Sequence, residues 1–350
     1  MTEILGMVTM FSPLFVIVWV ANLAEARRSR EEPYGGLAVV AYVFLIALYV
    51  AGMLGGIAAQ LASMQLRANP SVLADAGIDL QFELASLPLL ALGLWLPSLL
   101  GLILLLRPAR KLAARFTALD PDSPVHAVAL SLSMLVLINL FFTLGIGIGN
   151  LADVMAESGS SGDTTILYLW VQQILTALLA VVGVGWLTRR SWRETRLRLG
   201  LTMPTSRQWL IGVGFGWGLV VVVIIVEALA SGMGLGADAD VERLTEQLLG
   251  SLFLTPLGIL TIGLSAGLGE ETLFRGAMLP RFGFVATAVY FALVHSQYGI
   301  TLSTLIVLLL GLVLGWLRLR YNTSTAMITH AVYNSTLGVI AYIAATYLNG

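Results

Sequence analysis

Residues 254–276 read LTPLGILTIGLSAGLGEETLFRG, an apolar stretch that ends in two glutamates and an arginine. Its apolar part can enter a lipid bilayer, because a membrane-spanning helix needs about 20 predominantly apolar residues. Ionised side chains are costly inside the hydrocarbon and mark functional sites by default. The stretch therefore predicts a membrane helix with a functional site at its end, formed by Glu270, Glu271 and Arg275.

The composition of the whole chain is that of a membrane protein. Of its 350 residues, 58% are hydrophobic and 11% are charged, whereas soluble domains carry about 25% charged residues. The net charge of −1 gives no electrostatic basis for binding nucleic acid. The absence of cysteine excludes disulfides, thiol catalysis and thiolate metal sites. We therefore expect an all-α polytopic transmembrane helical bundle that has the lipid bilayer as its partner.

About ten segments have the length and apolar character of a membrane span. They are residues 4–24, 37–63, 83–106, 125–149, 165–187, 208–231, 252–270, 283–297, 300–317 and 325–347. Of the 19 basic residues, all except Arg67 and Arg243 follow odd-numbered segments. Basic residues remain on the cytoplasmic side, so we expect the odd-numbered spans to end in the cytoplasm and both termini to lie outside.

A basic segment divides the chain into two parts. Residues 191–209 mix arginine with leucine and tryptophan, a pattern typical of a helix that lies along the membrane interface. We predict an N-terminal transmembrane helical extension over residues 1–190, with about five spans, and a catalytic helical core over residues 191–350. Lys111 is the single lysine among the basic residues. This bias is typical of a GC-rich prokaryote, so we expect a prokaryotic inner membrane.

Side chains of catalytic type gather in the last spans. The segment 283–297 contains FALVH, in which His295 comes four residues after Phe291. The final span contains HAVYN, which includes His330 and Asn334. These residues and the two glutamates come from three helices, so we expect them to converge on one site within the membrane.

Three polar residues occur in the earlier spans. Asn139, Gln172 and Gln173 are uncharged and lie within apolar segments. Uncharged polar side chains in membrane helices commonly form hydrogen bonds to other helices. We interpret all three as such interhelical partners.

Helix geometry gives the two adjacent glutamates different surroundings. Glu271 and Arg275 lie at i and i+4, in the favourable order for an ion pair. Neighbouring helical residues diverge by about 100°, so Glu270 lacks that partner and is free to act as a general base. His330 and Asn334 share a helix face and can both donate hydrogen bonds to a developing oxyanion.

The three clusters resemble the signature of a known protease family. EETLFR, FALVH and HAVYN match, in order, the EExxxR, FxxxH and HxxxN motifs of the CAAX protease and bacteriocin-processing family, which includes the Rce1-type CAAX prenyl endopeptidases. The resemblance covers roughly residues 197–347. Three motifs in the family's order are far more specific than any one of them.

The resemblance implies an intramembrane endopeptidase. Glu270 would activate a water molecule, which His295 would help to position. His330 and Asn334 would form the oxyanion hole. The remaining motif residues, Glu271, Arg275 and Phe291, would support the site or engage the substrate.

A metal-dependent version of this protease is one alternative. Glu270, His295 and His330 provide the ligand types of a His₂Glu zinc site. The sequence lacks HExxH, in which both histidines share one helix face. We expect a glutamate-type protease without a cofactor, with zinc as the alternative.

Two kinds of protein without protease activity could also carry these residues. A non-catalytic membrane scaffold or an immunity-type protein would keep the same residues for binding. A transporter would spread its charged residues along a pathway through both halves, and the clustering here disfavours it. We expect a peptide or membrane-protein substrate, cleaved at a site that opens to the cytoplasm.

Overall fold

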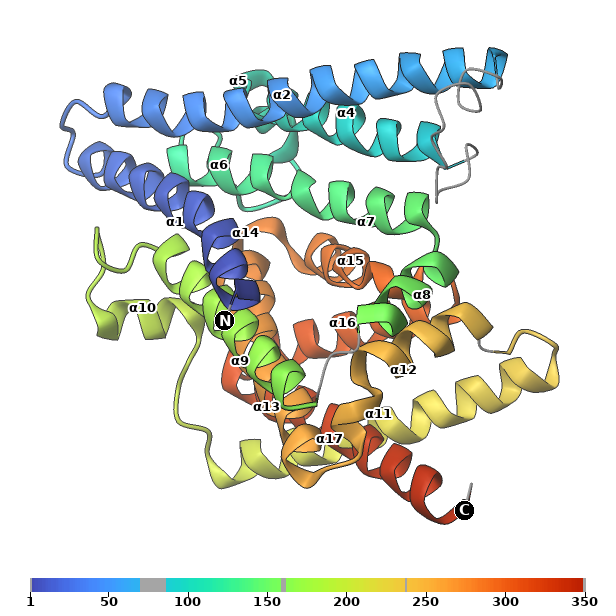
Figure 1. Cartoon of the computed structure of the whole chain (residues 1–350). Helices are drawn as coiled ribbons and strands as arrows, with labels where there is room; N and C mark the ends of the chain where they lie inside the picture. The colour runs from blue at the N-terminus through green and yellow to red at the C-terminus, as the bar shows by residue number, and fades with distance from the viewer. Residues whose placement is uncertain (1, 70–85, 159–161, 237, 349–350) are drawn as a thin grey trace.

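The computed structural model describes residues 2–69, 86–158, 162–236 and 238–348. Within these ranges the chain forms helices and no strand, and one isolated β-bridge joins Trp186 and Arg190. Eight helices in the described ranges are long and apolar enough to cross a membrane. The predicted all-α polytopic helical bundle is therefore confirmed (Figure 1).

The described residues among 35–146 form a layer of helices in the upper part of Figure 1, whereas those among 148–183 lie lower, against helices of the C-terminal part. The helices of the N-terminal part are α1 (Thr2–Arg28), α2 (Gly35–Ala68), α4 (Leu87–Leu104), α5 (Arg107–Ala113), α6 (Pro124–Leu132), α7 (Met134–Ile146), α8 (Ile148–Ser158) and α9 (Gly162–Gly183). The long α2 packs along α4. Gly56 allows this approach, because a Cβ atom there would lie 2.6 Å from the backbone nitrogen of Trp95.

The C-terminal part begins with a short helix that follows the basic segment. Its helices are α10 (Trp192–Leu199), α11 (Ser206–Gly232), α12 (Ala239–Phe253), α13 (Pro256–Glu271), η1 (Thr272–Met278), α14 (Leu279–Phe282), α15 (Phe284–Val294), η2 (Ser296–Tyr298), α16 (Leu302–Arg320), α17 (Thr323–Ile343) and η3 (Ala344–Leu348). Both α10 and α11 begin with a capping box, which satisfies the free N–H groups of the first turn. The predicted boundary between the two parts, at residue 190, stays a prediction.

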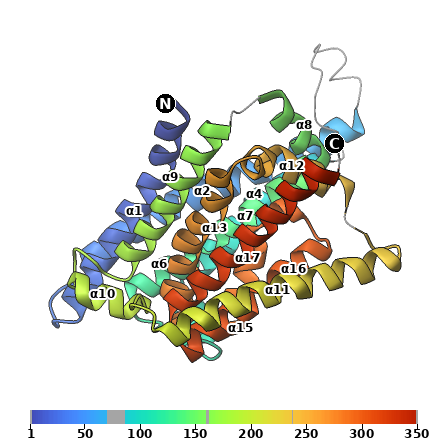
Figure 2. The ribbon, with the colours of Figure 1, turned by 90° about the horizontal axis from the view of Figure 1, so that it is seen from below.

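Helix α13 lies between α9 on one side and α17 on the other, and α11 packs against α17 (Figure 2). Small residues allow both contacts of α13. A Cβ atom at Gly263 would lie 2.6 Å from the carbonyl oxygen of Ala331 on α17, and one at Gly269 would lie 2.7 Å from the carbonyl oxygen of Gln173 on α9. In a membrane, helices associate through such close approaches of backbone. This packing brings an N-terminal helix against the helix that carries the two glutamates.

The seventh span is longer than the sequence predicted. The prediction ended this span at residue 270, whereas the helix continues from Pro256 to Phe282 over 27 residues, through α13, η1 and α14. A helix of this length measures about 40 Å, so Glu270 lies about 20 Å from either end. The charges at 270, 271 and 275 had suggested the end of the span. Their partners on other helices remove that reason to leave the membrane.

Two of the ten predicted spans are not among the eight long apolar helices. The segment 283–297 forms α15, which is apolar but has only 11 residues. The segment 325–347 forms most of α17, whose 21 residues include histidine, asparagine, serine and threonine. The predicted start of the third span, at residue 83, lies outside the described residues.

Candidate active site

The structure brings the predicted site residues together in two pairs. Glu270 of α13 faces His295, which ends α15, with 3.7 Å between Oε2 and Nε2. Glu271 of α13 contacts His330 of α17, with 2.9 Å between Oε1 and Nδ1. Asn334 lies one turn after His330 on α17. Side chains from three helices thus meet near the middle of the seventh span.

The seventh span changes its helix type directly after the two glutamates. Directly after Glu271 the helix widens into η1, a π-helix, and such segments frequently occur at functional sites. Arginines from two other helices donate to its carbonyl oxygens. Arg318 of α16 donates from Nε to the Arg275 carbonyl at 3.2 Å, and Arg198 of α10 donates from Nη1 to the Gly276 carbonyl at 2.9 Å. These bonds fix η1 to the helices that surround it.

Glu271, Arg275 and His330 form a buried polar cluster. Both Arg275 Nη1 and His330 Nδ1 lie 2.9 Å from Glu271 Oε1. The side chains are 0% exposed for Glu271, 1% for Arg275 and 3% for His330. Arg275 also donates from Nη2 to the carbonyl oxygen of Gly311 at 3.3 Å. The predicted ion pair between Glu271 and Arg275 is present, and its mutual pairing makes burial of both charges tolerable.

Phe291 joins this cluster to His295. Its side chain is fully buried, and the guanidinium carbon of Arg275 lies 4.0 Å from the centre of its ring. The same ring lies 4.8 Å from that of His295 and 5.9 Å from that of His330, measured between centroids. A cation over an aromatic face is attracted to it, more so when both are desolvated. Phe291 therefore packs against each of the three cationic or imidazole groups.

Glu270 has a different environment from its neighbour. Its Oε1 accepts a hydrogen bond from Nε2 of Gln173 at 3.1 Å, while its Oε2 is buried without a hydrogen-bond partner among the described residues. The side chains of Glu270 and His295 are 17% and 18% exposed, unlike the closed cluster beside them. The unpartnered oxygen is the one that faces His295.

The backbone determines which nitrogen of His295 carries the proton. Its Nδ1 lies 2.7 Å from the carbonyl oxygen of Phe291. A carbonyl oxygen can only accept, so Nδ1 must be the donor, and Nε2 of the neutral ring holds a lone pair. In that neutral form, Nε2 and an ionised Glu270 carboxylate are two acceptors that face each other across 3.7 Å. A water molecule that donates one hydrogen to each would satisfy both.

Residues from the N-terminal part fix the turn that follows His295. Asn139 of α7 donates from Nδ2 to Oγ of Ser296 at 2.8 Å, and the hydroxyl of Thr143 lies 2.8 Å from the same oxygen. The ring of Tyr298 is parallel to the imidazole of His295, with an angle of 3° between the planes. The prediction that Asn139 forms an interhelical hydrogen bond is confirmed.

Of the two predicted donors to the oxyanion, His330 already bonds Glu271 through one ring nitrogen. Nδ1 of His330 is engaged by Glu271, so Nε2 can donate only in a ring that carries a proton on both nitrogens. Asn334 is half-buried, and its side chain makes no hydrogen bond within the described part of the chain. Its amide is therefore free to donate to a substrate.

The segment that carries these residues is similar to a known family. Residues 252–336 match the family model of the Rce1-like type II CAAX prenyl endopeptidases. The segment runs from the end of α12 into α17 and contains all three motifs. No curated protein and no solved structure matches the chain. The match confirms the predicted resemblance over a shorter range than residues 197–347. The eight apolar helices indicate an integral membrane protein, and residues 252–336 within it are similar to the Rce1-like endopeptidases.

Gln173 is the residue near Glu270 that the sequence did not assign to the site. The prediction of an interhelical hydrogen bond is confirmed, but the partner is the carboxylate proposed as the base. Gln173 belongs to α9, outside the segment that matches the family model. A glutamine in the middle of an apolar span was the available signal, and its partner is 97 residues away.

We expect Gln173→Leu to slow peptide hydrolysis about tenfold, because Glu270 loses one charge-assisted hydrogen bond worth about 1.5 kcal/mol. Gln172→Leu is the matched control, since Gln172 is adjacent and its side chain does not contact Glu270. The measurement is the initial rate of reporter cleavage by both variants in liposomes. Equal rates in the two variants would show that the Gln173 contact does not matter for the reaction.

Two cavities approach the site from opposite ends of the bundle. One, of about 1390 Å³, lies among α11, α12, α16 and α17 and reaches Tyr298 and Tyr333. The other, of about 420 Å³, lies at the arginine-rich end and reaches Val294 and Phe274. The proposed catalytic side chains line neither cavity. The expectation that the site opens to the cytoplasm stays a prediction.

The three candidate zinc ligands, Glu270, His295 and His330, belong to two different pairs of side chains. Among the described residues, no group of three or more histidine, cysteine, aspartate or glutamate side chains is arranged to hold a metal ion. His330 Nδ1 pairs with Glu271, whereas His295 Nε2 faces Glu270. The choice between the glutamate-type protease and the zinc alternative stays a prediction.

Proposed function

We propose that the chain is a glutamate-type intramembrane endopeptidase that hydrolyses peptide bonds without a metal. The observation that carries this proposal is the gap between Glu270 Oε2 and His295 Nε2, which are 3.7 Å apart. Both are acceptors, and Oε2 has no hydrogen-bond partner among the described residues. This arrangement suits a water molecule that is held by both groups and activated by the carboxylate.

In the proposed reaction, the water oxygen attacks the carbonyl carbon of the scissile peptide while Glu270 takes one of its protons. The negative charge develops on the former carbonyl oxygen. Asn334 and Nε2–H of His330 would donate hydrogen bonds to this oxygen. The intermediate then collapses, the C–N bond breaks, and the proton held by Glu270 passes to the leaving amine.

The buried cluster supports the oxyanion role of His330. Nε2 can donate only if the ring is protonated or if the proton leaves Nδ1. The carboxylate of Glu271 lies 2.9 Å from Nδ1 and can only accept, so Nδ1 carries the hydrogen of this bond. A doubly protonated ring beside Glu271 would therefore present Nε2–H to the substrate, and Arg275 would hold Glu271 in place.

The expected substrate is a peptide segment or membrane protein that enters the bilayer, in a prokaryotic inner membrane, with products released to the cytoplasm. The depth of Glu270, about 20 Å from either helix end, supports cleavage within the membrane. The arginine-rich ends of the spans support a cytoplasmic position for the α10 end of the bundle.

Reconstitution tests the reaction and its metal requirement together. The full chain in liposomes is expected to cleave a fluorogenic transmembrane reporter peptide, and 1,10-phenanthroline should lower the rate less than about twofold, because no step passes through a metal. A loss that added zinc reverses would favour the metal-dependent alternative. Absence of cleavage, together with a cellular phenotype that persists in Glu270→Ala, would favour the non-catalytic scaffold.

A further inference from the structure

The smaller cavity has a charged rim and an apolar wall. It lies at the arginine-rich end of the bundle, between α1, α6 and α9 on one side and η1 and α14 on the other, with a volume of about 420 Å³. Four half-buried arginines line it: Arg189, Arg190, Arg198 and Arg281. Its apolar wall includes Leu14, Val18, Val128, Leu132 and Leu179.

The rim arginines bind neutral groups rather than carboxylates. Arg189 donates from Nε to Oδ1 of Asn22 at 3.0 Å. Arg190 donates to the carbonyl oxygen of Val184, and Arg281 donates to that of Ala118 at 3.3 Å. Arg198 donates to backbone carbonyls of η1. None of the four has an ion pair among the described residues, although Glu25 attracts Arg189 and Arg190, and Glu194 attracts Arg190, at longer range.

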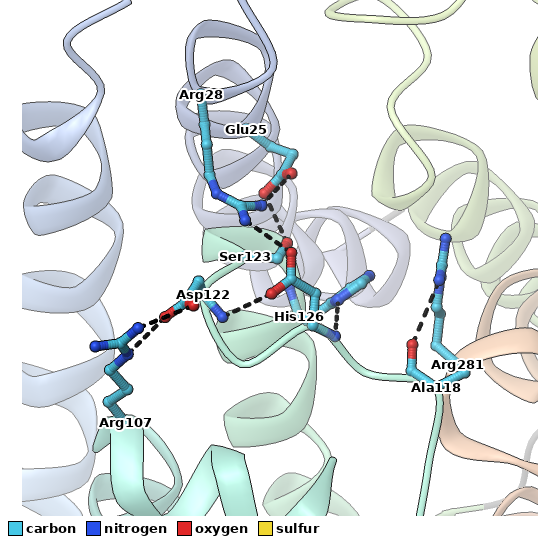
Figure 3. Close-up of polar contacts among 9 residues, drawn as sticks. Glu25, Arg28, Arg107, Ala118, Asp122, Ser123, His126 and Arg281 are labelled. Carbon is cyan, nitrogen blue, oxygen red and sulfur yellow. Dashed lines mark hydrogen bonds and ion pairs between the residues drawn. The ribbon is translucent and has the colours of Figure 1, made fainter. Parts of the chain in front are cut away.

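The two carboxylates of the cavity are already engaged by another arginine. Arg28 pairs with Glu25 at 2.9 Å and with Asp120 at 2.8 Å. The second carboxylate oxygen of Glu25 accepts the hydroxyl of Ser123 at 2.6 Å. Figure 3 shows this network beside Arg281, whose side chain reaches Ala118 instead. The network therefore places both carboxylates on Arg28 and leaves the rim arginines without an ion pair among the described residues.

Burial, followed by mutual repulsion, disfavours the charged form of the rim arginines. Burial and the neighbouring charge of Arg190 lower the pKa of Arg189 to about 10. Burial and the charges of Arg281 and Arg190 lower the pKa of Arg198 to about 10. Both groups remain protonated at neutral pH, so the rim holds repelling cations that a bound anion would stabilise.

The backbone after α9 orients two of the rim arginines. Gly185 has a φ of +105°, and a Cβ atom there would lie 2.7 Å from Cγ of Arg189. The N–H groups of both Arg189 and Arg190 donate to the Gly185 carbonyl at 3.0 Å. A tight turn that requires glycine thus folds both side chains back toward the cavity.

We propose that this cavity binds an anionic phospholipid, with the phosphate on the rim arginines and an acyl chain along the apolar wall. Guanidinium groups recognise phosphate oxygens through paired, charge-assisted hydrogen bonds. Basic pockets between membrane helices on the cytoplasmic side are suited to anionic headgroups. The apolar wall favours a lipid over free phosphate, which has no group to place there. The proposal does not depend on peptide hydrolysis.

Native mass spectrometry of the detergent-purified full chain tests the site. Added phosphatidylglycerol is expected to give a retained adduct, while phosphatidylcholine with the same acyl chains gives at least about fivefold less, since it lacks net negative charge. Arg189→Gln/Arg281→Gln should lower the phosphatidylglycerol adduct at least about fivefold, because two of the phosphate donors are lost. Arg189→Lys/Arg281→Lys keeps both charges but loses the paired donors of guanidinium, so it should retain more adduct than the glutamine double variant and less than the wild type.

Arg193→Gln is the matched control, because Arg193 is exposed in the same basic segment and does not line the cavity. It removes one positive charge and should leave the adduct unchanged. Thermal unfolding in phosphatidylcholine alone checks that each variant is folded. Equal adducts with both lipids, or wild-type retention by the folded glutamine double variant, would overturn the proposal. Competition by inorganic phosphate, with equal and weak retention of both lipids, would overturn the assignment to a lipid.

Discussion

Glu270→Gln is expected to lower the rate of peptide hydrolysis about 10³-fold, within the range that general base catalysis contributes. Glutamine has nearly the same shape as glutamate but cannot accept the proton of the attacking water. Its Oε1 can still accept the hydrogen bond that Gln173 donates to Glu270. The variant should therefore fold normally and bind substrate. The measurement is the initial cleavage rate of a transmembrane reporter in liposomes, with product identity checked by mass spectrometry.

Glu227→Gln is the matched control for this experiment. Glu227 also belongs to a membrane-spanning helix, α11, but its side chain is exposed and does not contact Glu270 or His295. The same chemical change there should leave the rate unchanged. Cleavage by Glu270→Gln at the wild-type rate would show that Glu270 is not the base. An equal loss in both variants would point to a general effect of removing carboxylates from the membrane helices.

The helices of the bundle could be predicted largely from apolar length alone. Long uniform segments such as 208–231 form helices close to the predicted bounds, in this case Ser206–Gly232. Local helix geometry also predicted the pair of Glu271 and Arg275, because i and i+4 side chains are neighbours on any α-helix. These successes involve interactions within one segment.

The failures involve interactions between segments. The seventh span continues past Glu271 because that side chain meets His330, which is 59 residues later in the chain. A hydropathy score treats each charged residue as if it faced lipid. It takes no account of a partner on another helix. The π-helix that follows Glu271 has no distinct sequence signal, because its stabilising contacts come from Arg198 and Arg318 on other helices.

In the site, too, features within one segment could be predicted and contacts between segments could not. The sequence placed Glu270, His295, His330 and Asn334 in late spans, and the motifs gave their order. It could not show that Nδ1 of His330 is occupied by Glu271, since sharing a face with Asn334 does not determine which ring nitrogen faces the substrate. Nor could it predict the contribution of α9.

Arg275→Met is expected to lower the free energy of unfolding by about 3–5 kcal/mol, the usual cost of breaking a buried ion pair on one side. Arg275 is 1% exposed and donates to Glu271 and to the Gly311 carbonyl. Methionine fills much of the same volume, so the main loss is electrostatic. Glu271 would remain buried with His330 as its one partner. The measurement is unfolding of the purified chain in mixed micelles with increasing sodium dodecyl sulfate.

Arg320→Met is the control for removal of an arginine. Arg320 is exposed at the end of α16 and contacts the ring of Tyr321. Its replacement should change the free energy of unfolding by less than about 0.5 kcal/mol, as for most surface substitutions. A similar loss in both variants would contradict a special role for the buried pair.

A double variant separates the structural role of the buried pair from its role in the reaction. Glu271→Gln/Arg275→Met removes both charges and should recover at least about 2 kcal/mol relative to Arg275→Met, because no unpaired charge remains buried. Its hydrolysis rate should nevertheless stay low, since His330 loses the carboxylate that binds Nδ1 and orients the ring toward the oxyanion. Recovery of both stability and rate would mean that Glu271 only fills space beside His330. Recovery of stability without rate would separate the carboxylate's effect on His330 from its part in holding the fold.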